Sequence, residues 1–171
     1  MTLSQLQTLK AFIDADATLS AFPNDEDGAI PCAAALNLST SPSYWVWRTS
    51  VSESEYTRQS AVDTDGVTVT NWSWTTFIGR SQGERDAWPR LFMGGGTGCN
   101  PALANVRSAF SDIFSGAGGA NQRAHLLASS RRLASRFEKL FATGTGSASV
   151  PALMGLEGPV SAADVNNARH S

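Results

Sequence analysis

The sequence predicts a mainly α fold: a helical bundle over residues 1–143, a β-hairpin inserted at about 56–78, and an extended C-terminal arm with a short helix over 144–171. Three observations lead to this fold class. Apolar residues recur at helical spacing through most of the chain. One central segment is instead rich in β-branched and aromatic residues on either side of a turn signal. The glycine-containing stretch TGTGS then follows the longest amphipathic segment.

The first part of the chain predicts two antiparallel helices. The apolar residues of the first recur at helical spacing, namely Leu6, Leu9, Phe12 and Ile13. Phe22-Pro23 breaks the chain, and the acidic run at 24–27 supplies a cap and negative charge ahead of the second helix. Because a helix tolerates proline in its first turn, Pro31 places the start of the second helix near Ala29.

The central segment predicts extended structure. Aromatic residues around Val46 favour a short strand, although this stretch could equally continue into a helix capped at Ser52. The hairpin is predicted by two runs, 56–62 and 67–77, on either side of the turn signal at 63–66. It would carry Trp72 and Trp74. These tryptophans are more often core residues than a stacking platform, but on a hairpin they could anchor an interface.

Two helices are predicted between this hairpin and the long amphipathic segment. A capping box of Ser81 and Glu84 opens the first, which Pro89 should kink or split. Asn100 and Pro101 provide the cap and first position of the next. A glycine-rich turn at 116–119 then leads into the following helix, so these two helices should be antiparallel neighbours.

The longest predicted helix covers residues 119–142 and has two faces. Its apolar residues share one face, namely Leu126, Leu127, Leu133, Ala134, Phe137, Leu140 and Phe141. The opposite face is basic and carries His125, Arg132, Arg136 and Lys139, with Arg131 on its flank. Gly144 and Gly146 end the helix and would act as the pivot of the arm.

The basic face has two interpretations. In the structural one, its side chains pair with carboxylates of a neighbouring subunit, such as Asp112 or Glu138. In the functional one, Arg132, Arg136 and Lys139 contact phosphates of DNA. The structural interpretation is favoured, because charge runs on helices are usually solvated or paired.

Composition narrows the class of protein. Only 16% of the residues are charged, against about 25% in typical soluble domains, which suggests a surface partly covered by other subunits. The formal net charge of -2 argues against a dedicated nucleic-acid binder. No apolar run approaches the ~20 residues of a membrane helix, so we expect a protein made in a cytoplasm, with no membrane partner.

The sequence predicts no enzyme, cofactor or metal site. The glycine cluster MGGGTG at 93–98 lacks the lysine of a phosphate-binding loop and is expected to be a linker. His125 is expected to be solvated on the basic face, and His170 lies at the terminus, with no metal-ligand spacing around either. Cys32 and Cys99 form neither a disulfide framework nor a zinc motif.

Several stretches carry a resemblance to a known family. They are ALNLSTSPSYWVWRTSV at 35–51, the run from LFM to GCNPALANVRSAFSDIFSG ending at 116, and RAHLLASSRRLASRFEKLFATGTGS with its tail PALMGLEGPVSAADV. On these stretches the chain resembles a family of tailed-bacteriophage proteins encoded among head and tail morphogenesis genes. The resemblance covers well over half of the chain, and its last block is the most specific.

The resemblance implies a virion structural protein of the neck, assembled in the host cytoplasm. We expect a head-to-tail connector or adaptor that forms a ring of about twelve copies beneath the portal. Its partners would be further copies, the portal protein, and a tail terminator or other neck protein, with non-specific contact to genomic DNA in the channel. The arm would reach a neighbour, for instance by adding a strand. The alternative is a small DNA-binding or packaging factor that uses the basic face of the predicted helix at 119–142.

Overall fold

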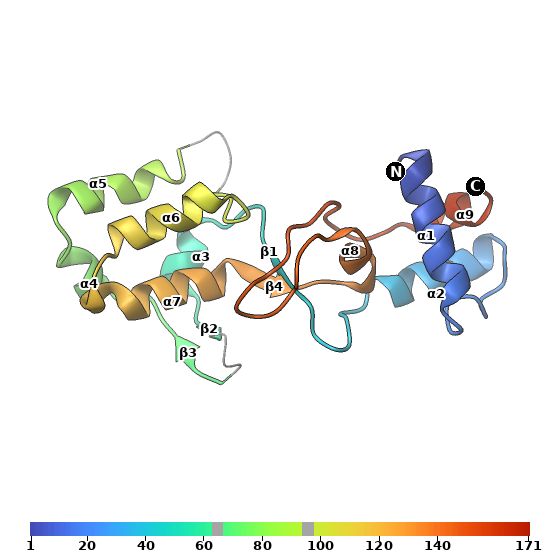
Figure 1. The fold of residues 1–171 in the computed structure, drawn as a ribbon, viewed down its shortest axis with the longest axis horizontal. Helices are drawn as coiled ribbons and strands as arrows, with labels where there is room; N and C mark the ends of the chain where they lie inside the picture. The colour runs from blue at the N-terminus through green and yellow to red at the C-terminus, as the bar shows by residue number, and fades with distance from the viewer. Residues whose placement is uncertain (63–66, 94–97) are drawn as a thin grey trace. The chain divides into compact units, whose positions relative to one another are not determined.

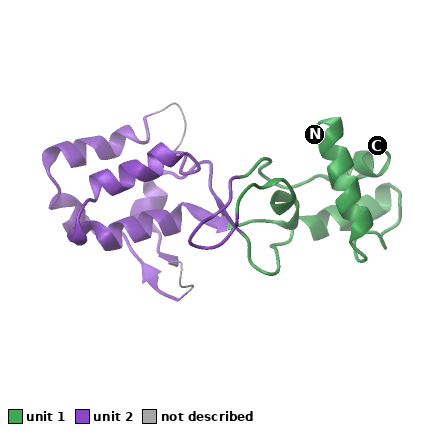
Figure 2. Cartoon of the chain, viewed as in Figure 1, with its two compact units in different colours: residues 1–44, 133–144, 154–171 green, residues 45–132, 145–153 purple. Residues whose placement is uncertain are grey.

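The computed structural model describes residues 1–62, 67–93 and 98–171, and this part of the chain is mainly helical, as predicted (Figure 1). It divides into two compact units (Figure 2). Unit 1 contains residues 1–44, 133–144 and 154–171, and unit 2 contains residues 45–132 and 145–153. The C-terminal segment therefore contributes to both units.

Unit 1 is built from α1 (Leu3–Ala15), α2 (Glu26–Leu36), α8 (Arg136–Phe141) and α9 (Ala162–Arg169). Helix α9 packs against both α1 and α2. Each long helix of the unit begins at a side-chain cap, provided by Thr2, Asp25 and Ser161. The buried apolar core consists of Leu9, Ile13, Leu19, Ala29, Cys32, Ala33, Leu36, Phe137, Val160, Val165 and Ala168.

Helix α2 begins three residues earlier than predicted, at Glu26, so Pro31 lies inside it. The Asp25 carboxylate accepts a hydrogen bond from Gly28 N at 2.8 Å, and Glu26 and Asp27 place negative charge in the first turn. Pro31 has no N–H to donate to the carbonyl of Asp27. Because Asp27 is exposed, water can donate to that carbonyl instead. The strong cap therefore outweighs the proline.

Unit 2 contains a larger set of short elements. Its helices are α3 (Glu53–Arg58), α4 (Trp74–Ile78), α5 (Gln82–Arg90), α6 (Ala104–Ile113), the 3₁₀ turn η1 (Ala117–Gly119) and α7 (Ala120–Ser129). Its strands are β1 (Trp45–Trp47), β2 (Ala61–Val62), β3 (Val69–Thr70) and most of β4 (Arg131–Leu133). Helices α6 and α7 contact each other, as predicted. The core contains Val51, Tyr56, Trp88, Cys99, Phe110, Ile113, Phe114 and Leu126.

The hairpin exists but is much shorter than the predicted span of 56–78. Strands β2 and β3 pair antiparallel, with Ala61 opposite Thr70 and Val62 opposite Val69. Tyr56 belongs to α3, and 74–78 forms α4, because the Ser73 hydroxyl accepts from Thr76 N at 3.2 Å and starts a helix there. The turn signal at 63–66 lies outside the described residues.

The predicted helix over 119–142 is wrong. Helix α7 ends at Ser129, residues 131–133 form β4, and α8 begins only at Arg136. Strand β4 pairs with β1 in an antiparallel sheet, and Arg48 N donates to Ser130 O at 2.9 Å beside it. A capping box between Ser135 and Glu138 then starts α8. Serines that bond the backbone favour such breaks, even where the apolar spacing continues.

Two smaller predictions near prolines also differ from the structure. Pro89 does not split its helix, because α5 continues to Arg90 and the proline lies in its last turn. Helix α6 begins at Ala104 rather than at Pro101, because the Asn100 side chain caps only a turn, accepting from Ala102 N at 3.0 Å. Of the glycine cluster at 93–98, residues 94–97 lie outside the described part of the chain.

Candidate interaction surface

The structure separates the residues of the predicted basic face. Arg132 lies on β4 in unit 2, whereas Arg136 and Lys139 lie on α8 in unit 1. Arg131 is buried, with its guanidinium donating to the carbonyls of Val62 and Ala148. The helix break at Ser129 is the reason, because it replaces one continuous helical face by a strand and a new helix.

Arg136 and Lys139 line a groove in unit 1 with a volume of about 650 Å³. Their positions differ by three residues, so both side chains project from one side of α8. The remaining lining combines apolar and hydroxyl side chains, namely Phe12, Leu38, Ser39, Thr40, Ser41 and Leu140. Such a groove suits an occupant that carries both an apolar group and a negative charge.

Arg136 is partly neutralised by the protein itself. Its guanidinium forms an ion pair with the Asp16 carboxylate and lies 5.9 Å from the centre of the Phe12 ring. The Leu19 backbone N–H, helped by that of Thr18 and by Arg136, holds the pKa of Asp16 below its usual value. Arg136 is therefore fixed at one edge of the groove.

Lys139 is the exposed cation of the groove. Its ammonium lies 5.3 Å from the centre of the Tyr44 ring. It forms no ion pair with any residue that the structure describes. The Tyr44 hydroxyl in turn donates to Gly144 O at 2.9 Å, which orients the ring. Lys139 is thus available to an anionic partner.

The Asp16 interaction gives a pH dependence of stability. Because the folded-state pKa is lowered, the stabilisation is complete above the unfolded value near 3.8 and is lost as pH falls through the folded value. We expect Asp16→Asn to lower the free energy of unfolding at pH 6, and this deficit to shrink towards pH 3. Urea titrations at both pH values measure it, with Asp14→Asn, an exposed carboxylate two residues earlier in α1, as the charge-removal control. A deficit independent of pH would contradict this assignment.

One interpretation of the basic face expected Glu138 to pair with a neighbouring subunit, but its carboxylate is buried within its own chain. It is 3% exposed, and its two carboxylate oxygens accept from Ser135 N and Gly158 N, each at 3.0 Å. It therefore ties α8 to the C-terminal segment. The capping-box pattern of Ser135 and Glu138 is the sequence signal that could have revealed both this role and the helix break.

The two tryptophans predicted to anchor an interface, Trp72 and Trp74, lie in different environments. Trp72 packs into the core of unit 2, with its ring centre 4.9 Å from that of Trp88 and 5.8 Å from that of Phe114. Trp74 is 55% exposed on α4, and Ile78, one turn later, is 63% exposed. Only Trp74 can therefore contribute to an interface.

Gly144 and Gly146 lie just after the end of α8 at Phe141. Both have positive φ, 129° and 66°, which favours glycine. After Gly146 the chain pairs with its own β1: Trp45 N donates to Gly146 O at 2.7 Å, and Ala152 N donates to Trp45 O at 2.9 Å. The segment expected to reach a neighbour thus adds its strand within the same chain.

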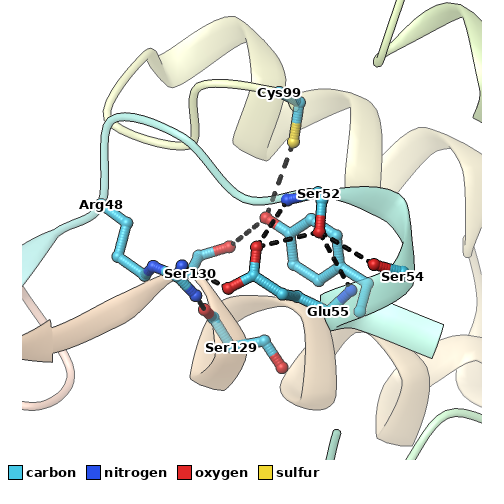
Figure 3. A network of polar contacts seen from close by, with 8 residues as sticks. Arg48, Ser52, Ser54, Glu55, Cys99, Ser129 and Ser130 are labelled. Carbon is cyan, nitrogen blue, oxygen red and sulfur yellow. Dashed lines mark hydrogen bonds and ion pairs between the residues drawn. The ribbon is translucent and has the colours of Figure 1, made fainter. Parts of the chain in front are cut away.

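A second polar cluster lies inside unit 2 (Figure 3). The buried Tyr56 hydroxyl lies 2.8 Å from Ser130 Oγ, and Cys99 Sγ lies 3.6 Å from the same hydroxyl. Burial raises the pKa of both Tyr56 and Cys99, so both groups stay protonated near neutral pH. Arg48 pairs with Glu55 at the edge of the cluster. This cluster holds α3 against α7 and offers no activated nucleophile.

His125 is buried, which corrects the expectation that it is solvated. Its Nε2 donates to Tyr56 O at 2.8 Å, and its Nδ1 lies 3.1 Å from Thr70 Oγ1. The side chain therefore connects α7 to α3 and to β3. A histidine on an otherwise helical pattern gives no sequence signal that distinguishes this role from solvation.

No known protein-family model matches this chain, and searches of curated proteins and of solved structures find no match either. Across residues 1–62, 67–93 and 98–171, no three His, Cys, Asp or Glu side chains are grouped so that they could hold a metal ion. In the same ranges no helix is both long and apolar enough to cross a membrane.

Proposed function

We propose that the chain is a structural protein of a tailed-phage virion, a head-to-tail connector or adaptor that forms a ring in the neck. About twelve copies would make the ring, which is one of the forms, beside an open filament, that a repeated heterologous contact produces. The partners are further copies, the portal protein on one side, and a tail terminator or other neck protein on the other. The role is mechanical: the ring joins head to tail and leaves a channel for DNA.

The observation that carries this proposal is the exposure of large apolar side chains in both units, on helices α2 and α4 and in the bend that follows α2. Ile30 and Leu38 are 62% and 64% exposed in unit 1, and Trp74 and Ile78 are similarly exposed in unit 2. Exposed aromatic and aliphatic anchors are typical of surfaces that partners cover. The low charged fraction agrees with covered surfaces, and the resemblance to phage morphogenesis proteins supplies the kind of assembly.

Electron microscopy of virions from the encoding phage tests the location. We expect density for the two units of this chain, repeated around the tail axis between portal and tail. A virion whose neck is fully accounted for by other proteins would contradict the proposal. Antibody labelling of the same particles gives an independent readout of the position.

A small DNA-binding or packaging factor is the second candidate. The observation in its favour is that Arg136 and Lys139 line the same groove. It predicts DNA affinity that falls steeply with salt and drops in the double variant Arg136→Ala, Lys139→Ala. Because Arg136 is paired with Asp16 and Arg132 lies on a separate strand, we expect no measurable binding to duplex DNA at 50 mM salt. Salt-sensitive binding by the wild type but not the variant would favour this candidate instead.

A further inference from the structure

The groove of unit 1 calls for an occupant that is both apolar and acidic. Phe12, Leu38 and Leu140 form its apolar side, and Leu38 is 64% exposed at its edge. Arg136 already forms an ion pair with Asp16. The positive charge that an anionic occupant could neutralise is therefore that of Lys139. An anion alone would leave the apolar side exposed to water, and an apolar group alone would leave Lys139 without an ion-pair partner.

The same unit carries a surface of the complementary kind. Glu26 and Ile30 are one turn apart on α2, and both are exposed. They border a cavity of about 430 Å³ between α2 and α9, together with Ala29, Ala162, Ala163, Asn166 and Asn167. Within the described ranges, neither Glu26 nor its neighbour Asp27 forms an ion pair. This acidic and apolar surface is called the α2 face below.

The groove and the α2 face lie towards opposite ends of one rigid element. The α2 face belongs to the N-terminal half of α2, whereas residues 38–41 of the groove directly follow its C-terminus. The 11 residues of α2 span about 16 Å, and the two surfaces share no residue. One copy can therefore use both surfaces at once, with a different neighbour at each.

We propose that the groove binds the α2 face of a second copy of this chain. Ile30 of one copy would pack against the apolar side of the groove in the next, and Glu26, with Asp27 beside it, would face Lys139. Such a contact is heterologous, and it closes a ring when the rotation from one copy to the next is a whole fraction of a full turn. This inference rests on the proposed ring and identifies the surfaces that build it.

Cysteine cross-linking tests the contact directly. Ile30→Cys and Leu38→Cys are prepared as separate variants, mixed, and oxidised gently in the presence and absence of portal protein. The native Cys32 and Cys99 are 0% and 3% exposed and should not react. We expect linked pairs in the mixture and none in either variant alone. No linked pairs in any sample, or self-linking of Ile30→Cys alone, would overturn the proposal.

Charge exchange provides the second readout. We expect Lys139→Glu in the Leu38→Cys chain to lower the linked yield by about fivefold, and Glu26→Lys in the Ile30→Cys chain to restore it when both are mixed. Arg90→Glu is the matched control, since it makes the same charge change on an exposed residue of unit 2. The four mixtures are the unchanged pair, the pair with Lys139→Glu, the pair with both Lys139→Glu and Glu26→Lys, and the pair with Arg90→Glu. Equal linked yields in all four would show that Lys139 does not contact the α2 face. Circular dichroism checks that each variant is folded.

The two proposals fail in different ways. Rings on the portal with no cross-link between positions 30 and 38 would leave the neck role intact and overturn this interface. Cross-links that respond to charge exchange, in a protein that never joins the portal, would support the interface and overturn the neck role.

Discussion

Gly28→Ala is expected to lower the free energy of unfolding of unit 1 by more than a conservative change on its surface would. A Cβ on Gly28 would lie 2.0 Å from the backbone oxygen of Pro23, in the segment that leads into α2. Because that atom belongs to the backbone, α2 or the preceding turn must move, and the core around Ala29 and Cys32 moves with it. Overpacking of this kind typically costs 1–3 kcal/mol, so we expect a loss of about 3 kcal/mol.

The measurement is urea unfolding followed by circular dichroism, with hydrogen exchange of the α1, α2 and α9 peptides to locate the change. Gly83→Ala is the matched control: it also lies in a helix, and a Cβ there meets nothing within 4 Å. That variant should gain about 0.5–1 kcal/mol from the helical preference of alanine. A Gly28→Ala protein as stable as wild type would contradict the close approach of Pro23 to α2.

Tyr56→Ala is expected to have a comparable effect on unit 2. Tyr56 is fully buried, and its ring centre lies 5.6 Å from that of Phe110 and 6.0 Å from that of Trp88. Removing a buried aromatic ring leaves a cavity and typically costs 3–5 kcal/mol. Tryptophan fluorescence should report this loss, because all five tryptophans lie in unit 2.

Tyr56→Phe separates the ring from its hydroxyl. It removes the contact of the hydroxyl with Ser130 Oγ, but Ser130 still donates to Leu126 O at 2.6 Å. The expected cost is therefore about 1 kcal/mol. If the two variants were equally destabilised, the hydroxyl cluster rather than the aromatic packing would hold α3 in place.

Local signals predicted the fold class and the starts of α3 and α5. The capping signals at Ser52 and Ser81 each start a helix in the structure. These signals succeed because the cap and the first turn are neighbours in sequence. The short strand around Val46 was one of two alternatives, and both occur: β1 is followed by a helix capped at Ser52.

Local sequence patterns do not predict the structure where a segment distant in the chain decides it. The apolar spacing over 119–142 continues through β4, and only pairing with β1, more than 80 residues earlier, makes residues 131–133 extended. The burial of His125 depends likewise on α3 and β3, which its own helix does not reveal. The side chains predicted to form one basic face therefore lie in two different units.

The candidate site was predicted in part. Arg136 and Lys139 were identified from the sequence, and the structure places them together in one groove. Leu140 is their neighbour on α8, but the remaining lining residues, Phe12 and the 38–41 segment, come from parts of the chain about 100 or more positions away. No periodicity links residues so far apart. The groove therefore required the tertiary structure.

The proposed neck role requires copies of this chain to close into a ring on the portal. The most direct measurement is the mass of the complex formed when purified chain and portal are mixed, by native mass spectrometry. We expect one dominant complex with a fixed number of copies, about twelve, on each portal ring. A portal that emerges without bound chain, beside a monomer at every concentration tested, would contradict it.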